Sequence, residues 1–287
     1  METRIGISGW RYEPWRNVFY PDKLPQAKEL YYASRQMTSI EINGSFYSLQ
    51  KPSSYQKWFA DTPDDFMFSI KGPQYITHVR RLKDVEKPLA NFFGSGVLHL
   101  KHKMGPILWQ FPPSFRYDEE RLENFFKLLP RTIQDAAKLS KKADRVDPDY
   151  PEEAKKSPAP LRHAIEVRHP SFENPDFVEL VRKYNVAIVF ADTAGRWPYI
   201  EDVTSDFVYL RLHGDEELYA SGYGDETLKW WAKRIRTWQK GNMPKPDYAV
   251  TDTKPPQRSR DAFIYFDNDV KVHAPYDAQT LMRYLKV

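Results

Sequence analysis

The chain contains no cysteine, and this absence alone removes several classes of site. Without thiols there is no disulfide, no zinc–thiolate centre, no iron–sulfur cluster and no cysteine nucleophile. Hydrophobic stretches are also short, since no apolar run approaches the roughly 18 residues that cross a bilayer. Because residues 1–10 already have the pattern of a strand, we expect no cleavable signal, no membrane partner and a cytoplasmic location.

Glycine is scarce as well, with 12 residues in 287, and neither GxGxxG nor GxxxxGK[ST] occurs. An open, doubly wound sheet that binds nucleotides usually carries such a turn. The HExxH motif is missing too, no two histidines lie four residues apart, and no spacing demands a metal. We therefore expect no cofactor, although the acidic residues could in principle bind a divalent metal ion.

Charge of one sign is not in strong excess, because 43 basic residues face 39 acidic ones and the net charge is only +4. The basic residues are spread along the chain, whereas a nucleic-acid binder usually concentrates them on one face. The chain does have enough residues to form a hydrophobic core, since 41% are hydrophobic and 15% are aromatic. This composition is typical of a well-solvated globular protein with a sizeable core.

Eight short segments rich in β-branched or aromatic residues have the pattern of buried strands. They are residues 5–10, 39–47, 66–73, 105–112, 162–170, 186–193, 207–214 and 262–267. Helical patterns separate most of them, with Pro25 expected at a first helical position. The expected N-caps are Asp118, Asn174, Asp225 and Asp277. Eight alternating units predict a single (β/α)8 TIM barrel over residues 1–287, with an open doubly wound sheet as the alternative.

One stretch interrupts this rhythm. Residues 138–160 are charged, contain four prolines and show little apolar periodicity. They lie before the fifth expected strand, which places them near the N-terminal face of a barrel. We interpret this insertion as a mobile surface loop without a part in function.

Alternation along the strands sends a polar set of side chains into the barrel. In residues 39–47, for example, Ile40 and Ile42 share one face while Glu41 and Asn43 share the other. The same argument points the following side chains inward, near the strand ends: Ser8, Lys71, Gln110, Glu166, Arg168, Asp192, Tyr209, Arg211, His213 and Tyr265. Such charges are costly unless they are paired, so they form either a structural ion-pair network or a binding site for a polar anion.

Aromatic and histidine side chains surround this expected mouth. Trp10, Tyr47, Tyr219 and Tyr223 are candidates to stack on a ligand, whereas Trp15 and Phe111 are assigned to packing. Glycines in residues 219–224 either present backbone N–H groups to an anion or form a surface turn. Among the histidines, His213 is the candidate catalytic imidazole, His78 borders the mouth and His169 makes a strand-end hydrogen bond. The others are expected outside the site: His99, His102, His163 and His273.

Several motifs together carry a family likeness. They are Gly6–Ile–Ser8–Gly9–Trp10–Arg–Tyr12–Glu–Pro–Trp15, Glu41–Ile–Asn43–Gly–Ser45–Phe46–Tyr47, Phe68–Ser–Ile–Lys71, Leu108–Trp–Gln110–Phe111–Pro112–Pro113, Glu166–Val–Arg168–His169–Pro170 and Arg211–Leu–His213–Gly214. The chain resembles the YecE-like family, domain of unknown function 72, over nearly its whole length. The resemblance implies a TIM barrel but no settled activity. Where many members have Tyr–Phe–Asn–Asn and a later Asn–Ala, this chain has Tyr265–Phe266–Asp267–Asn268 and Asp277–Ala278.

Three functions follow as hypotheses. The first is an enzyme, a hydrolase or lyase, that uses Glu41 and Glu166 as an acid/base pair together with His213. Its substrate, a small polar anion, would be bound at the mouth by Lys71, Arg168 and Arg211. The second is a nucleic-acid-binding protein similar to endonuclease IV, and the third is a scaffold without activity.

Overall fold

The computed structural model describes residues 1–245 and 248–287, and its centre is a closed barrel of eight parallel strands in sequence order. The strands are β1 (Thr3–Ser8), β2 (Ser39–Ile42), β3 (Met67–Lys71), β4 (Met104–Gln110), β5 (His163–Glu166), β6 (Val186–Asp192), β7 (Phe207–Leu212) and β8 (Asp261–Phe266). Strand β8 pairs with β1 and closes the ring. The predicted α/β barrel is thus confirmed, and the open-sheet alternative is wrong.

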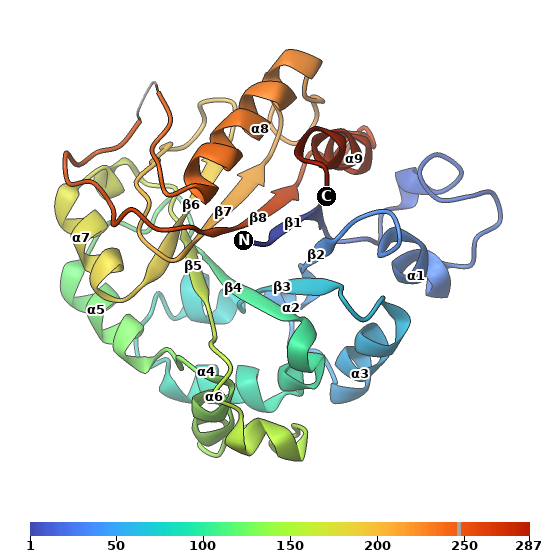
Figure 1. Cartoon of the computed structure of the whole chain (residues 1–287). Coiled ribbons are helices and arrows are strands. Elements are labelled where there is room, and N and C mark those ends of the chain that lie inside the picture. The colour runs from blue at the N-terminus through green and yellow to red at the C-terminus, as the bar shows by residue number, and fades with distance from the viewer. Residues whose placement is uncertain (246–247) are drawn as a thin grey trace.

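Helices form a ring around the barrel, with α8 and α9 side by side near the C-terminus (Figure 1). The α-helices are α1 (Glu29–Ala33), α2 (Gly44–Tyr47), α3 (Pro52–Asp61), α4 (Glu86–Gly94), α5 (Glu119–Leu128), α6 (Ile133–Ser140), α7 (Pro175–Lys183), α8 (Asp225–Gln239) and α9 (His273–Leu285). Short helical turns join them: η1 (Glu13–Trp15), η2 (Gln26–Lys28), η3 (Tyr75–Val79), η4 (Val97–Lys103), η5 (Glu152–Lys156) and η6 (Pro170–Phe172). Within the described ranges, no helix is both long and apolar enough to cross a membrane.

The strands bury both faces, as parallel barrel strands do. Outward side chains such as Ile40 and Ile42 pack under the helices in the main core. Inside the barrel, a second apolar cluster that includes Leu108, Val189 and Phe263 fills the lower part. The interior is therefore a packed core, and the charged side chains occupy only the layer near the C-terminal strand ends, which we call the mouth.

All eight predicted strands run past the observed C-terminal ends, six of them by one or two residues and the other two by four or five. The strand predicted for residues 39–47 stops at Ile42, because Asn43 takes a helical conformation (φ −87°, ψ −24°) and α2 follows. The strand predicted for 162–170 stops at Glu166, and Pro170 opens the turn η6. In these two strands, polar residues of the mouth extend the alternation of polar and apolar residues beyond the last residue that pairs with a neighbouring strand.

Helix starts were predicted with mixed success. Asp118 and Asn174 do cap α5 and α7, since each side chain accepts a hydrogen bond from a backbone N–H of the first turn. The other starts were wrong. Pro25 precedes the turn η2, Asp225 is the first residue of α8 rather than its cap, and Asp277 lies inside α9, which begins four residues earlier.

The insertion at 138–160 is not the free loop that its composition predicts. Its first residues end α6, its later residues form η5, and Pro160 forms an isolated bridge with Thr132. The side-chain oxygen of Asn91, in α4, accepts hydrogen bonds of 3.0 Å from the backbone N–H groups of both Asp144 and Arg145. The segment is therefore fastened along α4 and reaches toward the mouth.

Candidate functional site

Arg211, at the end of β7, is the centre of the charged layer and is fully buried. Its Nη1 donates to Glu166 Oε2 at 2.7 Å, and its Nη2 donates to Glu41 Oε1 at 3.0 Å and to Asp267 Oδ2 at 2.9 Å. We call these four residues the Arg211 cluster. One guanidinium thus occupies the space between three carboxylates that come from β2, β5 and the end of β8.

The two glutamates of the cluster have no free oxygen. Glu41 also accepts from the hydroxyls of Ser8 and Tyr209 (2.5 and 2.6 Å). Glu166 accepts from Gln110 Nε2 at 2.9 Å and from Arg168 Nε at 2.8 Å. Burial alone would raise the pKa of Glu166, but the neighbouring arginines hold it well below its usual range. The carboxylate is therefore ionised at neutral pH.

Asp267 is the member of the cluster that sequence analysis missed as a site residue. Its Oδ2 accepts from Arg211 and lies 3.0 Å from His213 Nδ1. Burial would raise its pKa, yet Arg211 and His213 lower it far below the usual value. A signal was present, because residue 267 continues the inward alternation of Phe263 and Tyr265 along β8. The family comparison had drawn attention only to its departure from asparagine.

Lys71, at the end of β3, lies beside the cluster without joining it. The side chain is 8% exposed, and among residues 1–245 and 248–287 no carboxylate lies within 4.0 Å of its Nζ. Instead, Nζ lies 4.3 Å from the ring centroid of Phe46. Burial, followed by repulsion from Arg211, lowers the pKa of Lys71 to about 8, although the three carboxylates act in the opposite direction.

Arg168 forms the wall of the mouth on the other side. Its Nε donates to Glu166 Oε1, its Nη2 forms an ion pair with the same oxygen at 2.7 Å, and its guanidinium lies 3.8 Å from the ring centroid of Trp197. In the described part of the chain Nη1 has no hydrogen-bond partner. The guanidinium is thus oriented by a carboxylate and an aromatic ring, with one edge unused.

The histidines lie as expected around this site. His213 is fully buried, packs edge-on against the Tyr219 ring, and has a pKa lowered by burial, so its imidazole is neutral. His78 packs against Phe46, and burial together with Lys71 lowers its pKa to about 4. His169 Nδ1 accepts from the backbone N–H of Ser171, which confirms the predicted strand-end hydrogen bond.

Other predicted residues lie away from the Arg211 cluster. Asp192 accepts from the Tyr223 hydroxyl at 3.0 Å, and burial raises its pKa to about 6. Tyr265 lies deeper in the barrel, where its hydroxyl contacts those of Ser39 and Ser69 at 2.7 Å. Asp192 therefore does not join the Arg211 cluster, in which Asp267 supplies the third carboxylate.

The glycine-containing segment after β7 forms a turn. Backbone N–H groups of Tyr219, Ala220 and Ser221 donate to carbonyls of the chain, and that of Tyr223 donates to Asp277 Oδ2. Few donors are left for an anion, so the surface-turn alternative is favoured here. Trp15 and Phe111 are fully buried, which confirms that they serve packing.

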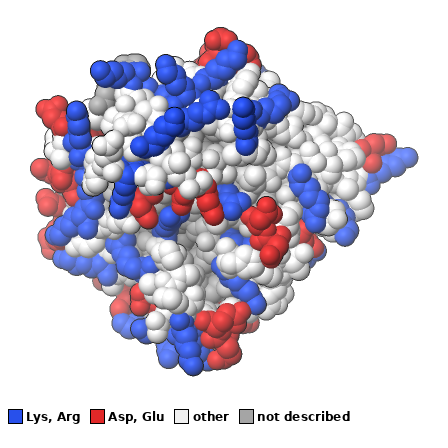
Figure 2. Space-filling view, viewed as in Figure 1, with Lys and Arg blue, Asp and Glu red and all other residues white. Residues whose placement is uncertain are grey.

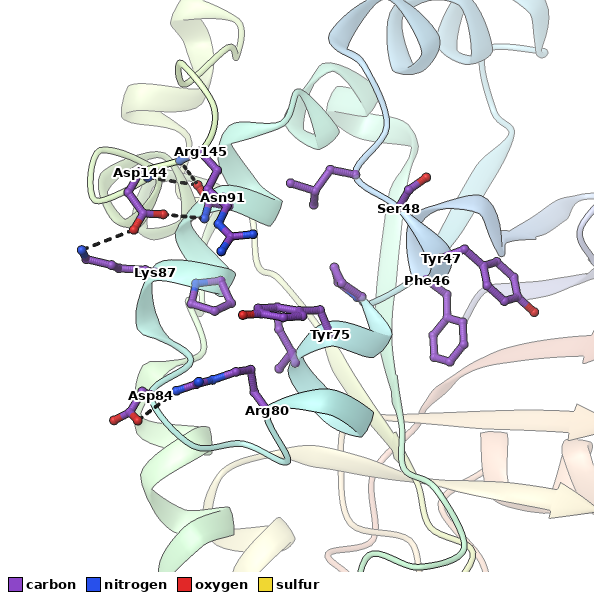
Figure 3. A pocket seen from close by; sticks show the side chains of 14 residues that line it. Phe46, Tyr47, Ser48, Tyr75, Arg80, Asp84, Lys87, Asn91, Asp144 and Arg145 are labelled. Atoms are coloured by element: carbon purple, nitrogen blue, oxygen red, sulfur yellow. Dashed lines mark hydrogen bonds and ion pairs between the residues drawn. The ribbon is translucent and has the colours of Figure 1, made fainter.

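Two pockets of about 270 Å³ flank the mouth, and the exposed ring of Tyr47 borders both. One contains Trp10 and Asn43, whose amide donates to Ser8 Oγ at 3.0 Å. In the other, the Tyr75 ring lies between Phe46 on one side and Asn91 and Arg145 on the other (Figure 3). Because Arg145 belongs to the insertion, the expectation that this segment keeps to the far face of the barrel was wrong.

No group of three or more His, Asp or Glu side chains is arranged to hold a metal ion in the part of the chain that the structure describes. The Arg211 guanidinium fills the space between the carboxylates of Glu41, Glu166 and Asp267. Fold and site together define a TIM-barrel protein with an internally neutralised charged mouth.

Comparisons with known proteins agree with this class. A family model described as "Protein of unknown function DUF72" matches residues 4–287, and the chain belongs to that family. It is 29% identical over 123 residues to the UPF0759 protein YunF of Bacillus subtilis (strain 168), covering 41% of this chain and 43% of YunF. It is also 29% identical over 141 residues to the UPF0759 protein YecE of Escherichia coli (strain K12), covering 42% and 49%. The chain thus spans less than half the length of these curated relatives.

Solved structures show the same fold. A DUF72 family protein from Thermotoga maritima MSB8 superposes with a TM-score of 0.75 at 22% identity, covering 100% of both chains. A DUF72 family protein from Enterococcus faecalis V583 gives a TM-score of 0.71 at 16% identity, covering 99% of this chain and 96% of the other. At these identities the likeness concerns the fold alone.

Proposed function

We propose that this protein is an enzyme that binds a small polar anion at the mouth and acts on it by proton transfer. The observation that carries the proposal is Lys71, a buried amine at a strand end beside the Arg211 cluster that has no carboxylate partner among the described residues. In TIM barrels, reactive groups lie at this end of the strands. Among the described residues, Lys71 Nζ and Arg168 Nη1 are two donors at the mouth without a hydrogen-bond partner, and both suit an anionic group.

The geometry changes the roles first expected for the acidic residues. Both oxygens of Glu41 and of Glu166 accept hydrogen bonds from the protein, and the low pKa of Glu166 makes it a poor general acid. We assign them as positioning residues that hold Arg211 and Arg168. His213 positions Asp267 in the same way. Proton transfer then falls to Lys71, because its pKa near 8 lets both protonation states exist close to neutral pH.

Binding of nucleic acid has less support as an alternative. On the face seen in Figure 2, basic side chains are distributed around much of the margin, with acidic side chains among them. A phosphate-binding surface would gather one sign of charge. The two functions differ in their salt dependence, since affinity for DNA falls steeply with salt as phosphate contacts are lost.

A thermal-shift screen tests the proposal. The purified protein is heated with phosphate, sulfate, small carboxylates, sugar phosphates and short single-stranded DNA at two salt concentrations. A ligand at about 100 times its dissociation constant stabilises the fold by roughly 2.7 kcal/mol, which is readily measured. We expect a small anion to stabilise the wild type and to lose this effect in Arg168→Ala and in Lys71→Met.

A matched control is Lys229→Ala, which removes an exposed lysine on α8 far from the barrel axis. This variant should respond to the anion like the wild type. Stabilisation by DNA alone that disappears at the higher salt concentration would replace our proposal with the nucleic-acid alternative. A small-anion effect that survives both mouth substitutions would place the anion elsewhere.

A further inference from the structure

Lys71 differs from an ordinary buried lysine in what surrounds its amine. Lys103, for comparison, is also buried, but its Nζ donates to the Phe59 and Thr62 carbonyls (2.7 and 2.9 Å) and to Thr62 Oγ1 (3.3 Å). Those three contacts give the Lys103 amine hydrogen-bond acceptors inside the protein. The described chain gives Lys71 no such set of acceptors, and the ring centroid of Phe46 lies 4.3 Å from its Nζ.

We propose that Lys71 forms an imine with the carbonyl carbon of a small anionic aldehyde or ketone. The inference deepens the proposed function, and it rests on the mouth being an anion site. It names the substrate class and gives Lys71 a covalent role. A lysine held in a desolvated setting beside other cationic groups is the usual way in which a protein prepares an amine for this chemistry.

The first requirement is a neutral amine, because only the lone pair of the unprotonated nitrogen can attack a carbonyl. Burial and the neighbouring Arg211 favour loss of the proton, as the pKa near 8 indicates. An exposed lysine, with a pKa of about 10.4, has a far smaller neutral fraction at pH 8. Lys71 should therefore react well before the surface lysines do.

The second requirement is stabilisation of the product, since an imine formed on lysine is protonated and carries a positive charge. Glu41, Glu166 and Asp267 all act on the Lys71 amine in the direction that favours its charged form. They would favour a fixed iminium charge in the same way. Burial thus favours the neutral amine that reacts, and the three carboxylates offset part of what burial costs the positively charged product.

The third requirement is orientation of the substrate. Arg168, whose Nη1 is unused and whose plane is fixed by Glu166 and Trp197, can bind the anionic group next to the carbonyl. Such a contact would hold the carbonyl carbon at the Lys71 amine. A neutral ketone lacks this contact and should react more slowly.

The step balances without an external oxidant or reductant. The neutral amine attacks the carbonyl carbon, and the electron pair of the C=O bond moves to oxygen, which takes up the proton that nitrogen releases. The resulting carbinolamine takes up one proton from solvent and loses water. The product is a protonated imine, in which a C=N bond to Lys71 replaces the C=O bond of the substrate. The carbonyl oxygen leaves as water.

Reductive trapping tests the inference directly. The folded protein is incubated separately with glyoxylate, pyruvate, glyceraldehyde 3-phosphate and dihydroxyacetone phosphate, and then reduced with sodium borohydride. Intact-mass measurement and peptide mapping follow. We expect one of these carbonyl compounds to give a single adduct on the peptide that contains Lys71, with Lys103 unmodified. Its rate of formation should rise with pH through about 8.

Two variants sharpen the result. Lys71→Arg keeps the positive charge but cannot form an imine, so the adduct should vanish while the unfolding temperature stays close to that of the wild type. Arg168→Ala should slow trapping of the anionic compound by about tenfold, the loss expected for one charged hydrogen bond, without slowing trapping of acetone.

The outcomes separate this inference from the proposed function. If small anions stabilise the wild type through Arg168 but none of the four compounds is trapped at Lys71, the imine is wrong and the anion site stands. Equal labelling of the wild type and Lys71→Arg also overturns the imine. If neither stabilisation nor trapping occurs, both proposals fail.

Discussion

Arg211 neutralises three buried carboxylates at once, so a neutral residue in its place leaves them without a counter-charge. Breaking a buried ion pair from one side typically costs about 3–5 kcal/mol. We therefore expect Arg211→Met to lower the free energy of unfolding by at least that amount, as measured by urea denaturation at pH 7. Lys57→Ala, which removes only the exposed i,i+4 pair with Asp61, should cost about 1 kcal/mol or less. Equal losses in the two variants would contradict the role given to Arg211.

Lys71 makes anion binding depend on pH. Its ammonium form attracts an anion and its neutral form does not, so affinity should fall as pH rises through about 8. In Lys71→Arg the charge persists, and affinity should stay level from pH 7 to pH 9. Calorimetric titration of the anion found in the thermal-shift screen measures both curves. A level wild-type curve would mean that Lys71 does not contact the anion.

At this scale, alternation along the strands correctly predicted which side chains point inward, including Glu41, Glu166 and Arg211. It could not predict their partners, because strands far apart in sequence bring those partners together across the barrel. Asp192 illustrates the limit. It ends β6 as expected, yet it bonds to Tyr223 from the loop after β7 instead of joining the charged cluster.

At the scale of elements, the insertion of residues 138–160 is held in place by contacts with α4. The insertion is fastened through Asn91, whose side-chain oxygen accepts two backbone hydrogen bonds. Asn91→Ala should cost about 1–3 kcal/mol, because two backbone donors lose their acceptor. Hydrogen exchange at Asp144 and Arg145 should accelerate. Lys87→Ala, which removes only the exposed ion pair with Asp144, should leave that exchange unchanged. Unaltered exchange in Asn91→Ala would show that other contacts hold the segment.

Element boundaries were less predictable than element types. The strand patterns located all eight strands, but every predicted strand ran past its true C-terminal end, and the two largest errors were at Ile42 and Glu166. Polar residues at the mouth imitate the alternation of a strand while they already belong to turns. The prediction of a free loop for the insertion was wrong for a different reason. Its contacts with α4 depend on Asn91, which no local sequence pattern marks.

On the scale of the whole molecule, acid should weaken the fold through the charged mouth. The pKa of Asp267 lies far below that of an aspartate in an unfolded chain, which is about 3.9. Its stabilising effect is thus complete above pH 5 and is lost as pH falls below about 4. Asp267→Asn should be less stable than the wild type at pH 7, and urea denaturation should show the gap narrowing progressively as the pH is lowered below about 4. A constant gap would mean that Asp267 is not held ionised.

The barrel itself was predictable because eight strand patterns alternate with helices, and this number closes a parallel sheet. The chemistry of the mouth was harder to predict from the sequence. The decisive feature is Lys71, which has no carboxylate partner in the described part of the chain, and this becomes visible only when the surrounding charges have been placed in space.

The most direct test of an anion site at the mouth is a crystal structure of the protein with the small anion that stabilises it most. We predict that the anion lies between Lys71 Nζ and Arg168 Nη1, with the Arg211 cluster unchanged beneath it. An anion bound elsewhere on the protein, with the mouth filled by solvent, would contradict the account.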